Sequence, residues 1–485
     1  MTELLTAPIE LLSSDSGHRR LIGARRLASI AAVVLLAGCS LGQHFQRPAA
    51  VTPPAWHTDA GTQPAWPAAD WWRGFSAPQL DELIAQAQAA NFDLAAAVAR
   101  IRQADAQARI AGAPLLPTLG ATGAITRERE PPAASGKKVI RPGDFTTINP
   151  GLAASYEIDF WGKNQAALEA AQATALASRF DRQTVELTVV TGVATTYFQI
   201  LELHDRLAVA EANIASAEIV LKALQTEQTV GTATALDTAQ QETTLAALEA
   251  QIPPLRQQLQ QSIDALAILV GRPPETVDVA GGTLASLTQP TVAPGLPSEL
   301  LARRPDIAEA EAQLKSAHAN ITVARAAFYP SINLTASGGV ASTALTGLLG
   351  PTGLFYALSA GVTQPIFEGG ALEGQLEFSK ARYDELLQDY RKSVVSAFSD
   401  VEDALVAVQQ TELQVQRQQD AVNKAQRAYD ISLAQLQAGT VNLLTVINTE
   451  NALFPAQDAL VQAKYAHLQS IVSLYKALGG GWSQS

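Results

Sequence analysis

Residues 387–436 read LQDYRKSVVSAFSDVEDALVAVQQTELQVQRQQDAVNKAQRAYDISLAQL, and an apolar side chain recurs at every seventh position. These positions are Leu387, Val394, Val401, Val408, Val415, Val422, Tyr429 and Leu436. Such spacing is typical of a coiled-coil seam, because it keeps one stripe of the helix facing a partner. The segment between Gln375 and Ala438 contains neither Gly nor Pro. It therefore predicts a single helix ~100 Å long, at a rise of about 1.5 Å per residue.

The same stripe occurs earlier in the chain, at Val193, Ile200, Leu207, Ile214 and Leu221. Each stripe stops near a glycine, Gly231 or Gly439, and leucine or isoleucine residues at heptad spacing follow. Glycine has the backbone freedom that a chain reversal requires. We therefore expect two long helical hairpins with tips at these glycines. Pro253-Pro254 should kink the first returning helix, and this pair has no counterpart in the second.

The chain is internally duplicated. Landmark residues recur 207 to 213 positions later, in the pairs Asp93 and Asp306, Pro117 and Pro330, Phe160 and Phe367, Gly231 and Gly439, and Gly271 and Gly479. We expect one repeat at residues 76–272 and the other at 298–480. A Pro- and Gly-rich linker without strong periodicity, residues 273–297, joins them, and residues 481–485 form a short tail.

Four short stretches alternate apolar and polar residues with a period of two. They lie at residues 119–125, 148–160, 332–340 and 354–362. About ten residues suffice for a tilted strand to cross a bilayer. Four strands cannot close a barrel, and open sheet edges do not persist in lipid. If these strands span a membrane, several chains share one barrel; a soluble two-sided sheet is the alternative.

The N-terminus has the features of an export signal. Four arginines precede an apolar run from Leu27 to Ala37 that is too short to span a bilayer. The run ends in Leu36-Ala37-Gly38-Cys39, which resembles a bacterial lipobox. This resemblance implies that residues 1–38 are cleaved and that Cys39, the one cysteine, carries lipid. Residues 39–75 would then form a lipid-anchored segment, and Ser40 favours the outer membrane.

Composition argues against several other functions. Charged residues make up 16% of the chain and the formal net charge is −12, so the clustered cations of a nucleic-acid binder are lacking. The six histidines are dispersed without metal-ligand spacing, and there is no Gly-rich phosphate loop or Gly-x-Ser-x-Gly turn. We expect neither an enzyme nor a cofactor.

Together, the lipobox, the duplicated strand-and-helix unit, Gln364-Pro365-Ile366-Phe367-Glu368-Gly369-Gly370 and Ala438-Gly439-Thr440 resemble the TolC-like outer-membrane factors. Within them, the chain is most similar to the NodT-type lipoproteins of resistance–nodulation–division efflux pumps. The resemblance covers nearly the whole mature chain. It implies a membrane α+β fold: a homotrimer with a twelve-stranded outer-membrane β-barrel, four strands per chain, continuous with a periplasmic α-helical coiled-coil barrel. It also implies a periplasmic adaptor and an inner-membrane pump as partners, and no nucleic acid.

The resemblance also places a gate just after the second tip glycine. The family's usual Asp positions correspond to Thr445 and Asn448, so an anionic ring is absent there. Leu444 is the candidate apolar constriction, which would gate by dewetting, although plain coiled-coil packing explains it equally well. Asn448 would hydrogen-bond across the threefold axis or set helix register. Asp237, which matches Thr445 in the first repeat, is the nearest acid.

The residues around the tips are the expected docking site for adaptor hairpins: Gly231, Thr232, Gly439 and Thr440. Opening would move the second hairpin outward. Three functions remain open at this point. The chain is a passive efflux channel for small molecules such as drugs, a type I protein-secretion duct, or a coiled-coil lipoprotein scaffold without a pore. The lipobox favours the first over the second, and the four amphipathic strands argue against the third.

Overall fold

The structure is a computed structural model that describes residues 44–57, 66–129, 134–135, 138–139, 144–279, 281–290, 292, 295–348, 350 and 353–482. The predicted signal peptide and Cys39 lie outside the described residues. Two compact units are present. Ile110–Leu168 and Ala319–Ser379 belong to the first, called here the strand unit. Gln46–Arg109, Glu169–His318 and Lys380–Ser485 form the second, called the helical unit.

Two long helices of equal length dominate the fold. They are α4 (Lys163–Thr229) and α9 (Ala371–Gln437), each with 67 residues, as the duplication predicts. The shorter helices α3 (Phe92–Gly112) and α8 (Pro305–Ala326) also occupy equivalent places in the two repeats. The remaining short helices are α2 (Pro78–Ala90) and α7 (Pro297–Leu300).

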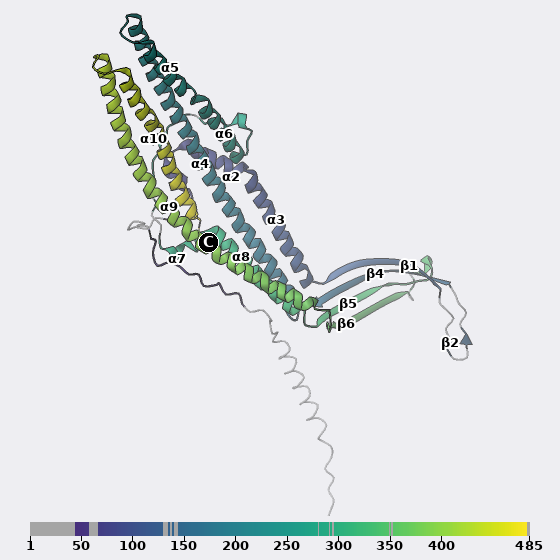
Figure 1. The fold of residues 1–485 in the computed structure, drawn as a ribbon. Helices are drawn as coiled ribbons and strands as arrows, with labels where there is room; N and C mark the ends of the chain where they lie inside the picture. The colour runs from purple at the N-terminus through teal and green to yellow at the C-terminus, as the bar shows by residue number, and fades with distance from the viewer. Residues whose placement is uncertain are drawn as a thin grey trace, which may run out of the picture. The chain divides into compact units, whose positions relative to one another are not determined.

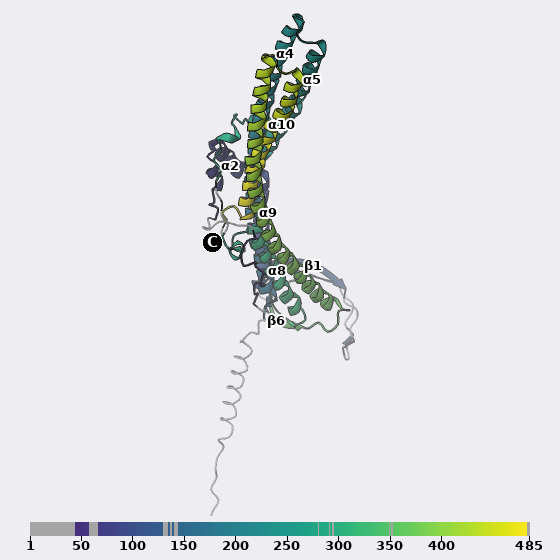
Figure 2. The same cartoon turned by 60° about the vertical axis from the view of Figure 1, so that its left-hand side comes forward.

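Each long helix is followed by a returning helix. After α4 the chain returns through α5 (Ala235–Glu249) and α6 (Ile252–Val270), and after α9 it returns through α10 (Leu443–Ala477). Figures 1 and 2 show α10 beside α9 in two views. All eight predicted seam positions of α9 are buried or half-buried. The two predicted hairpins are therefore confirmed.

The expected interruption of the first returning helix is also present. Helix α5 ends at Glu249 and α6 begins at Ile252, so Pro253 and Pro254 occupy the first turn of α6. Proline is tolerated there because the first N–H groups of a helix have no intrahelical acceptor. In the second repeat, α10 runs through a proline, Pro455, without ending.

The linker packs against the helices of its own unit. It contains two 3₁₀ turns, η3 (Pro274–Thr276) and η4 (Leu284–Ser286). Its apolar side chains Val277, Val279 and Leu284 are buried in the main core, which also holds η1 (Trp71–Phe75) and the middle of α4. Burial of these scattered residues fixes a segment in which the sequence shows no periodicity.

The strand unit contains one antiparallel sheet in the order β1-β4-β5-β6. Its strands are β1 (Thr118–Arg129), β4 (Asp144–Ile158), β5 (Ser331–Val340) and β6 (Leu354–Thr363), close to the four predicted segments. A short pair, β2 (Ala134–Ser135) and β3 (Lys138–Val139), lies between β1 and β4 in sequence. Two further 3₁₀ turns are η2 (Ala113–Leu115) and η5 (Leu345–Gly347).

The register places all the apolar residues of the alternation on one face. Ile125 pairs with Ile148, Tyr156 with Leu334, and Ala336 with Leu358. Thr118, Ser155, Thr335 and Ser359 form a row on the other face. Directly paired residues share a face of a sheet. The alternation of apolar and polar residues in each strand therefore gives the whole sheet one apolar face and one polar face.

An aromatic contact joins the two repeats at the base of the sheet. Trp161 Nε1 donates a hydrogen bond to the carbonyl of Pro330 at 2.8 Å, and its ring lies 4.7 Å from that of Tyr329. Trp161 therefore packs the end of the first repeat's sheet against the second repeat. Among the described residues, no helix combines the length and apolar character needed to cross a bilayer.

Candidate functional site: the hairpin tips and the helices behind them

The two tips have the same hydrogen-bonded geometry. Gly231 and Gly439 adopt φ of 79° and 72°, a conformation that glycine reaches without steric cost. The residue after each glycine folds back on its long helix. Thr232 donates through its N–H and hydroxyl to Glu227 O at 2.9 and 3.0 Å, and Thr440 does the same to Gln435 O at 2.9 and 3.0 Å. The four predicted tip residues thus form two matching turns.

Asp237 and Thr445 occupy equivalent positions in the caps of the returning helices. Thr234 and Asp237 form a capping box, in which the Asp237 carboxylate accepts from Thr234 N at 2.9 Å and from its hydroxyl at 2.7 Å. These hydrogen bonds hold the pKa of Asp237 below its usual value. In the second repeat, Asn442 Oδ1 accepts from the Thr445 hydroxyl at 3.0 Å. Both side chains therefore stabilise the start of a helix.

Leu444 and Asn448 lie on the solvent-exposed face of α10 in the single chain. They are one turn apart and both exposed, and Leu444 keeps 52% of its surface. The packing positions of this turn belong instead to Leu443, Val446 and Ile447, which are buried. Within the single chain, packing therefore does not account for Leu444. Leu236, its counterpart 208 positions earlier, is 65% exposed at the start of α5.

The sequence did not single out a buried polar contact between the hairpins. Gln241 of α5 and Glu450 of α10 are both 0% exposed, and their Nε2 and Oε2 atoms are 3.5 Å apart. Burial raises the pKa of Glu450 above its usual value. Glu450 lies three residues before the heptad leucine Leu453, at a position that packs against a neighbouring helix. An acidic residue at such a position is the sequence feature that could have identified this contact.

A second contact between the hairpins is an ion pair. Arg206 of α4 donates through Nε to Asp458 Oδ1 at 2.7 Å, and Glu202 lies 3.3 Å from the same guanidinium. Both partners of the Arg206–Asp458 pair are mostly buried. Together with Gln241 and Glu450, this pair fixes how the second hairpin packs against the first.

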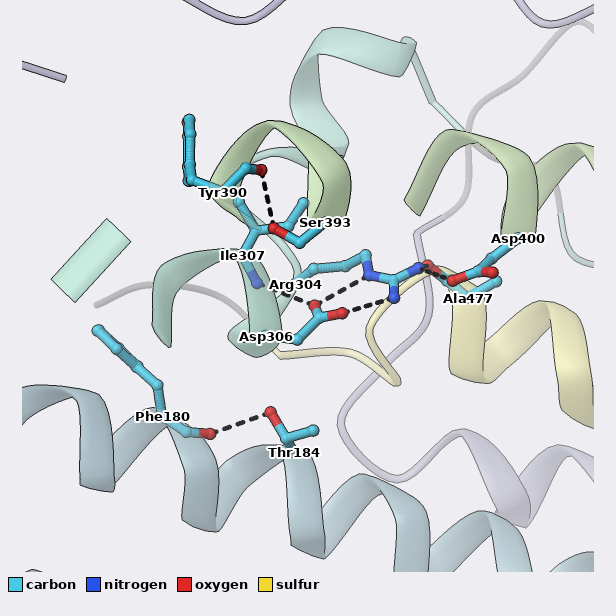
Figure 3. A network of polar contacts seen from close by, with 9 residues as sticks. All are labelled: Phe180, Thr184, Arg304, Asp306, Ile307, Tyr390, Ser393, Asp400 and Ala477. Atoms are coloured by element: carbon cyan, nitrogen blue, oxygen red, sulfur yellow. Dashed lines mark hydrogen bonds and ion pairs between the residues drawn. The ribbon is translucent and has the colours of Figure 1, made fainter. Parts of the chain in front are cut away.

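Figure 3 shows a polar network farther along the helical unit. The Arg304 guanidinium bonds Asp306 at 2.6 Å, Asp400 of α9 at 2.8 Å, and the carbonyl of Ala477 at the end of α10 at 3.3 Å. The Arg304 side chain is only 12% exposed. One buried cation therefore joins α8, α9 and α10. Among the described residues, no group of His, Cys, Asp and Glu is arranged to hold a metal ion.

Comparisons with known proteins agree with this architecture. The family described as outer membrane efflux protein matches residues 83–272 and 296–480. The pyoverdine export outer membrane protein OpmQ of Pseudomonas aeruginosa is 43% identical, over 94% of this chain and 97% of its own. The toluene efflux pump outer membrane protein TtgC of Pseudomonas putida is 33% identical, over 92% of this chain and 94% of its own.

Among solved structures, the MtrE outer membrane channel of Neisseria gonorrhoeae superposes with a TM-score of 0.83 at 29% identity. The superposition covers 91% of this chain and 98% of that one. The predicted fold class, with a four-stranded sheet and long duplicated hairpins in each chain, is confirmed, and the function is that of an efflux channel. Because both repeats match and the relatives align along nearly their whole length, the chain belongs to the outer membrane efflux protein family.

Proposed function

We propose that three copies of this chain form one passive conduit that exports small molecules across the outer membrane. The observation that carries this proposal is the sheet register, which gathers the apolar residues of four strands on one face. Many of these side chains are exposed in the single chain, among them Leu119, Ile125, Tyr356 and Leu358. Exposing such an apolar face to water costs free energy, whereas contact with lipid tails does not.

The two outer strands of the sheet support the threefold arrangement. Strands β1 and β6 each have a strand neighbour on one side only in the described chain. Unpaired backbone groups are costly in hydrocarbon, so each open edge needs a partner. Pairing β6 of one copy with β1 of the next closes the ring. Three copies contribute twelve strands and leave no edge.

In this conduit, Leu444 and Asn448 form the periplasmic constriction. Three copies of Leu444 give an apolar ring that excludes water and ions when narrow, and Asn448 adds amides one turn away. The exposure of both side chains on the single chain supports this role. Asp237 and Thr445 keep their capping roles, so we assign them to stabilising the first turns of α5 and α10.

The tips receive the periplasmic adaptor, and an inner-membrane pump of the resistance–nodulation–division type supplies the energy. The matching turns at Gly231-Thr232 and Gly439-Thr440 support this assignment, because they present two similar surfaces to one partner. Adaptor hairpins that settle between the tips would displace the second hairpin outward and open the constriction.

The chain is held at the membrane by lipid on Cys39 after removal of residues 1–38. Labelling cells with radioactive palmitate tests this directly. The wild-type chain should carry the label, and Cys39→Ser should not. A labelled Cys39→Ser chain, or an unlabelled wild type, would reject the anchor.

The export function is tested by accumulation of a fluorescent small molecule in cells that lack the gene. Accumulation should rise in the deletion strain and return to normal on complementation. Unchanged accumulation together with loss of a secreted protein would instead indicate a protein-secretion duct.

A further inference from the structure

A half-open cavity lies in the helical unit, between the two hairpins. Its volume is about 730 Å³, and its wall comes from α4, α5, α6 and α10. Cavities of roughly 300–1,000 Å³ accommodate drug-sized ligands. The lining includes the buried apolar side chains Leu248, Leu255 and Phe454. The cavity therefore has both the size and an apolar wall suited to a small organic molecule.

Glu450 is the acidic group of this wall that lacks a cation. It lines the cavity, and among the described residues its side chain has one hydrogen-bond partner, Gln241, whose Nε2 lies 3.5 Å from Oε2. Its Oε1 is buried and has no hydrogen-bond partner among the described residues. A buried carboxyl oxygen without a partner is costly, and a bound donor would satisfy it.

A proline in the second returning helix adds an acceptor to the same wall. Pro455 lines the cavity and has no N–H. Inside α10, its N–H would have bonded the carbonyl four residues earlier, at Asn451. Asn451 also lines the cavity. Its backbone carbonyl consequently lacks its usual helical donor.

The charges of the wall leave an acidic excess. Among the described lining residues, the one cation is Arg206, and its guanidinium already bonds Asp458 and Glu202. Glu450 therefore remains without a cation. A bare divalent ion would need several oxygen ligands within about 2.6 Å of a single point, and the described residues offer no such cluster.

We propose that this cavity binds a drug-sized organic amine, with its ammonium group at Glu450 and its apolar body against Leu248, Leu255 and Phe454. The ammonium donates hydrogen bonds to the unpartnered Oε1 and to the Asn451 carbonyl. This inference goes beyond the proposed function, because binding requires neither transport nor an open gate. It concerns the helical unit of the assembled protein.

Binding is tested on the purified full-length protein by equilibrium dialysis with three probes of matched shape. These are 4-phenylbutylamine, which is cationic at pH 7.5, neutral 4-phenylbutanol, and anionic 4-phenylbutyrate. The amine should bind saturably, one per chain, at least tenfold more tightly than the alcohol, and the anion should not compete. Equal binding of amine and alcohol would overturn the assignment to Glu450.

Two substitutions locate the site. Glu450→Gln keeps the shape of the side chain but removes its charge, and it should weaken amine binding at least tenfold while alcohol binding stays the same. Glu242→Gln is the matched control, because Glu242 occupies the equivalent position in the first repeat but is exposed. It should bind the amine as the wild type does.

Three results would overturn the proposal: unchanged binding in Glu450→Gln, equal loss in both variants, or stoichiometric displacement of the amine by millimolar Mg²⁺. The absence of saturable binding in the wild type would also overturn it. Because export is measured separately in cells, a failure here leaves the channel function untouched. A circular dichroism spectrum and a melting temperature like those of the wild type confirm that each variant is folded.

Discussion

Arg206 Nε of α4 and Asp458 Oδ1 of α10 are 2.7 Å apart, and this ion pair joins the two hairpins of one chain. A second hydrogen bond, from the guanidinium to Asp458 Oδ2 at 3.2 Å, makes the contact bidentate. Bidentate pairs of this kind are among the stronger polar contacts in proteins. If the second hairpin moves outward when the channel opens, this pair has to break or rearrange.

Asp458→Ala should therefore favour the open state. Loss of a hydrogen bond to a charged group costs about 1.5–3 kcal/mol, which corresponds to roughly a tenfold or larger shift toward opening. Single-channel recording in planar bilayers measures the shift as a higher open probability. Arg256→Ala is the control, because its pair with Glu211 is largely exposed and lies within one hairpin. Equal open probability in wild type and Asp458→Ala would contradict this prediction.

Leu444→Ser should raise the permeability of the outer membrane to large antibiotics. A hydroxyl in the constriction removes the apolar ring that excludes water, so the closed pore would wet. The minimal inhibitory concentration of a large antibiotic should fall at least fourfold in cells that express the variant. Leu413→Ser, at another exposed leucine on α9, should leave it unchanged. If both variants behave like the wild type, Leu444 is not part of the gate.

Asn442→Ala should loosen the first turn of α10. Loss of an N-cap costs about 1 kcal/mol, which increases local opening roughly fivefold. Amide hydrogen exchange measured by mass spectrometry should be faster in the peptide that spans residues 443–450. Asn442→Ser retains a capping oxygen and should exchange like the wild type. Unchanged exchange in the Ala variant would show that the cap does not hold this turn.

Glu309 makes stability depend on pH. Burial, followed by the nearby charges of Asp181 and Asp306, raises its pKa from 4.5 to about 7. A raised folded-state pKa means that the native state binds more protons than the unfolded state. Stability is therefore lost as pH rises from about 4.5 to 7.

The variant Glu309→Gln removes this penalty and can still accept the hydrogen bond from Gln313, whose Nε2 lies 2.8 Å from the Glu309 carboxylate. Its melting temperature should exceed that of the wild type at pH 8, and the difference should shrink toward pH 4.5. A difference that is independent of pH would refute the assignment.

The two faces of β6 should differ in the environment that they meet. Nitroxide labels at Tyr356 and Leu358 should be accessible to oxygen, which dissolves in lipid. Labels at Ala357 and Ser359 should be accessible to a water-soluble nickel complex. The alternation follows from the period-two geometry of a strand. Accessibility without this alternation, measured by electron paramagnetic resonance in reconstituted membranes, would contradict a spanning strand.

Periodicity predicted most of the fold. The seam of α9 and the four strands follow from patterns that extend over many residues, so a single exception does not obscure them. The tip glycines follow from their places after two matching heptad stripes, and both have positive φ. The Pro253-Pro254 pair predicted a kink, and the first returning helix is interrupted just before it, between α5 and α6, because proline is compatible with only a few helix positions.

Contacts between distant segments were beyond such patterns. Glu450 contacts Gln241 only because the two hairpins pack side by side. The sequence around a single acidic residue does not identify its partner in a distant helix. Arg304 likewise joins three helices through residues that are up to 173 positions away. The linker residues Val277, Val279 and Leu284 are buried without any periodic signal, because the surrounding core selects them. Pro455 inside α10 was not expected either.

The most direct test of the threefold barrel is the native mass of the protein extracted from outer membranes. Mass spectrometry from a mild detergent should give a single species at three times the mass of the mature chain, and heating in dodecyl sulfate should convert it to the monomer. A species of one chain mass before heating would contradict the account, because four strands alone leave two open edges that lipid does not accept.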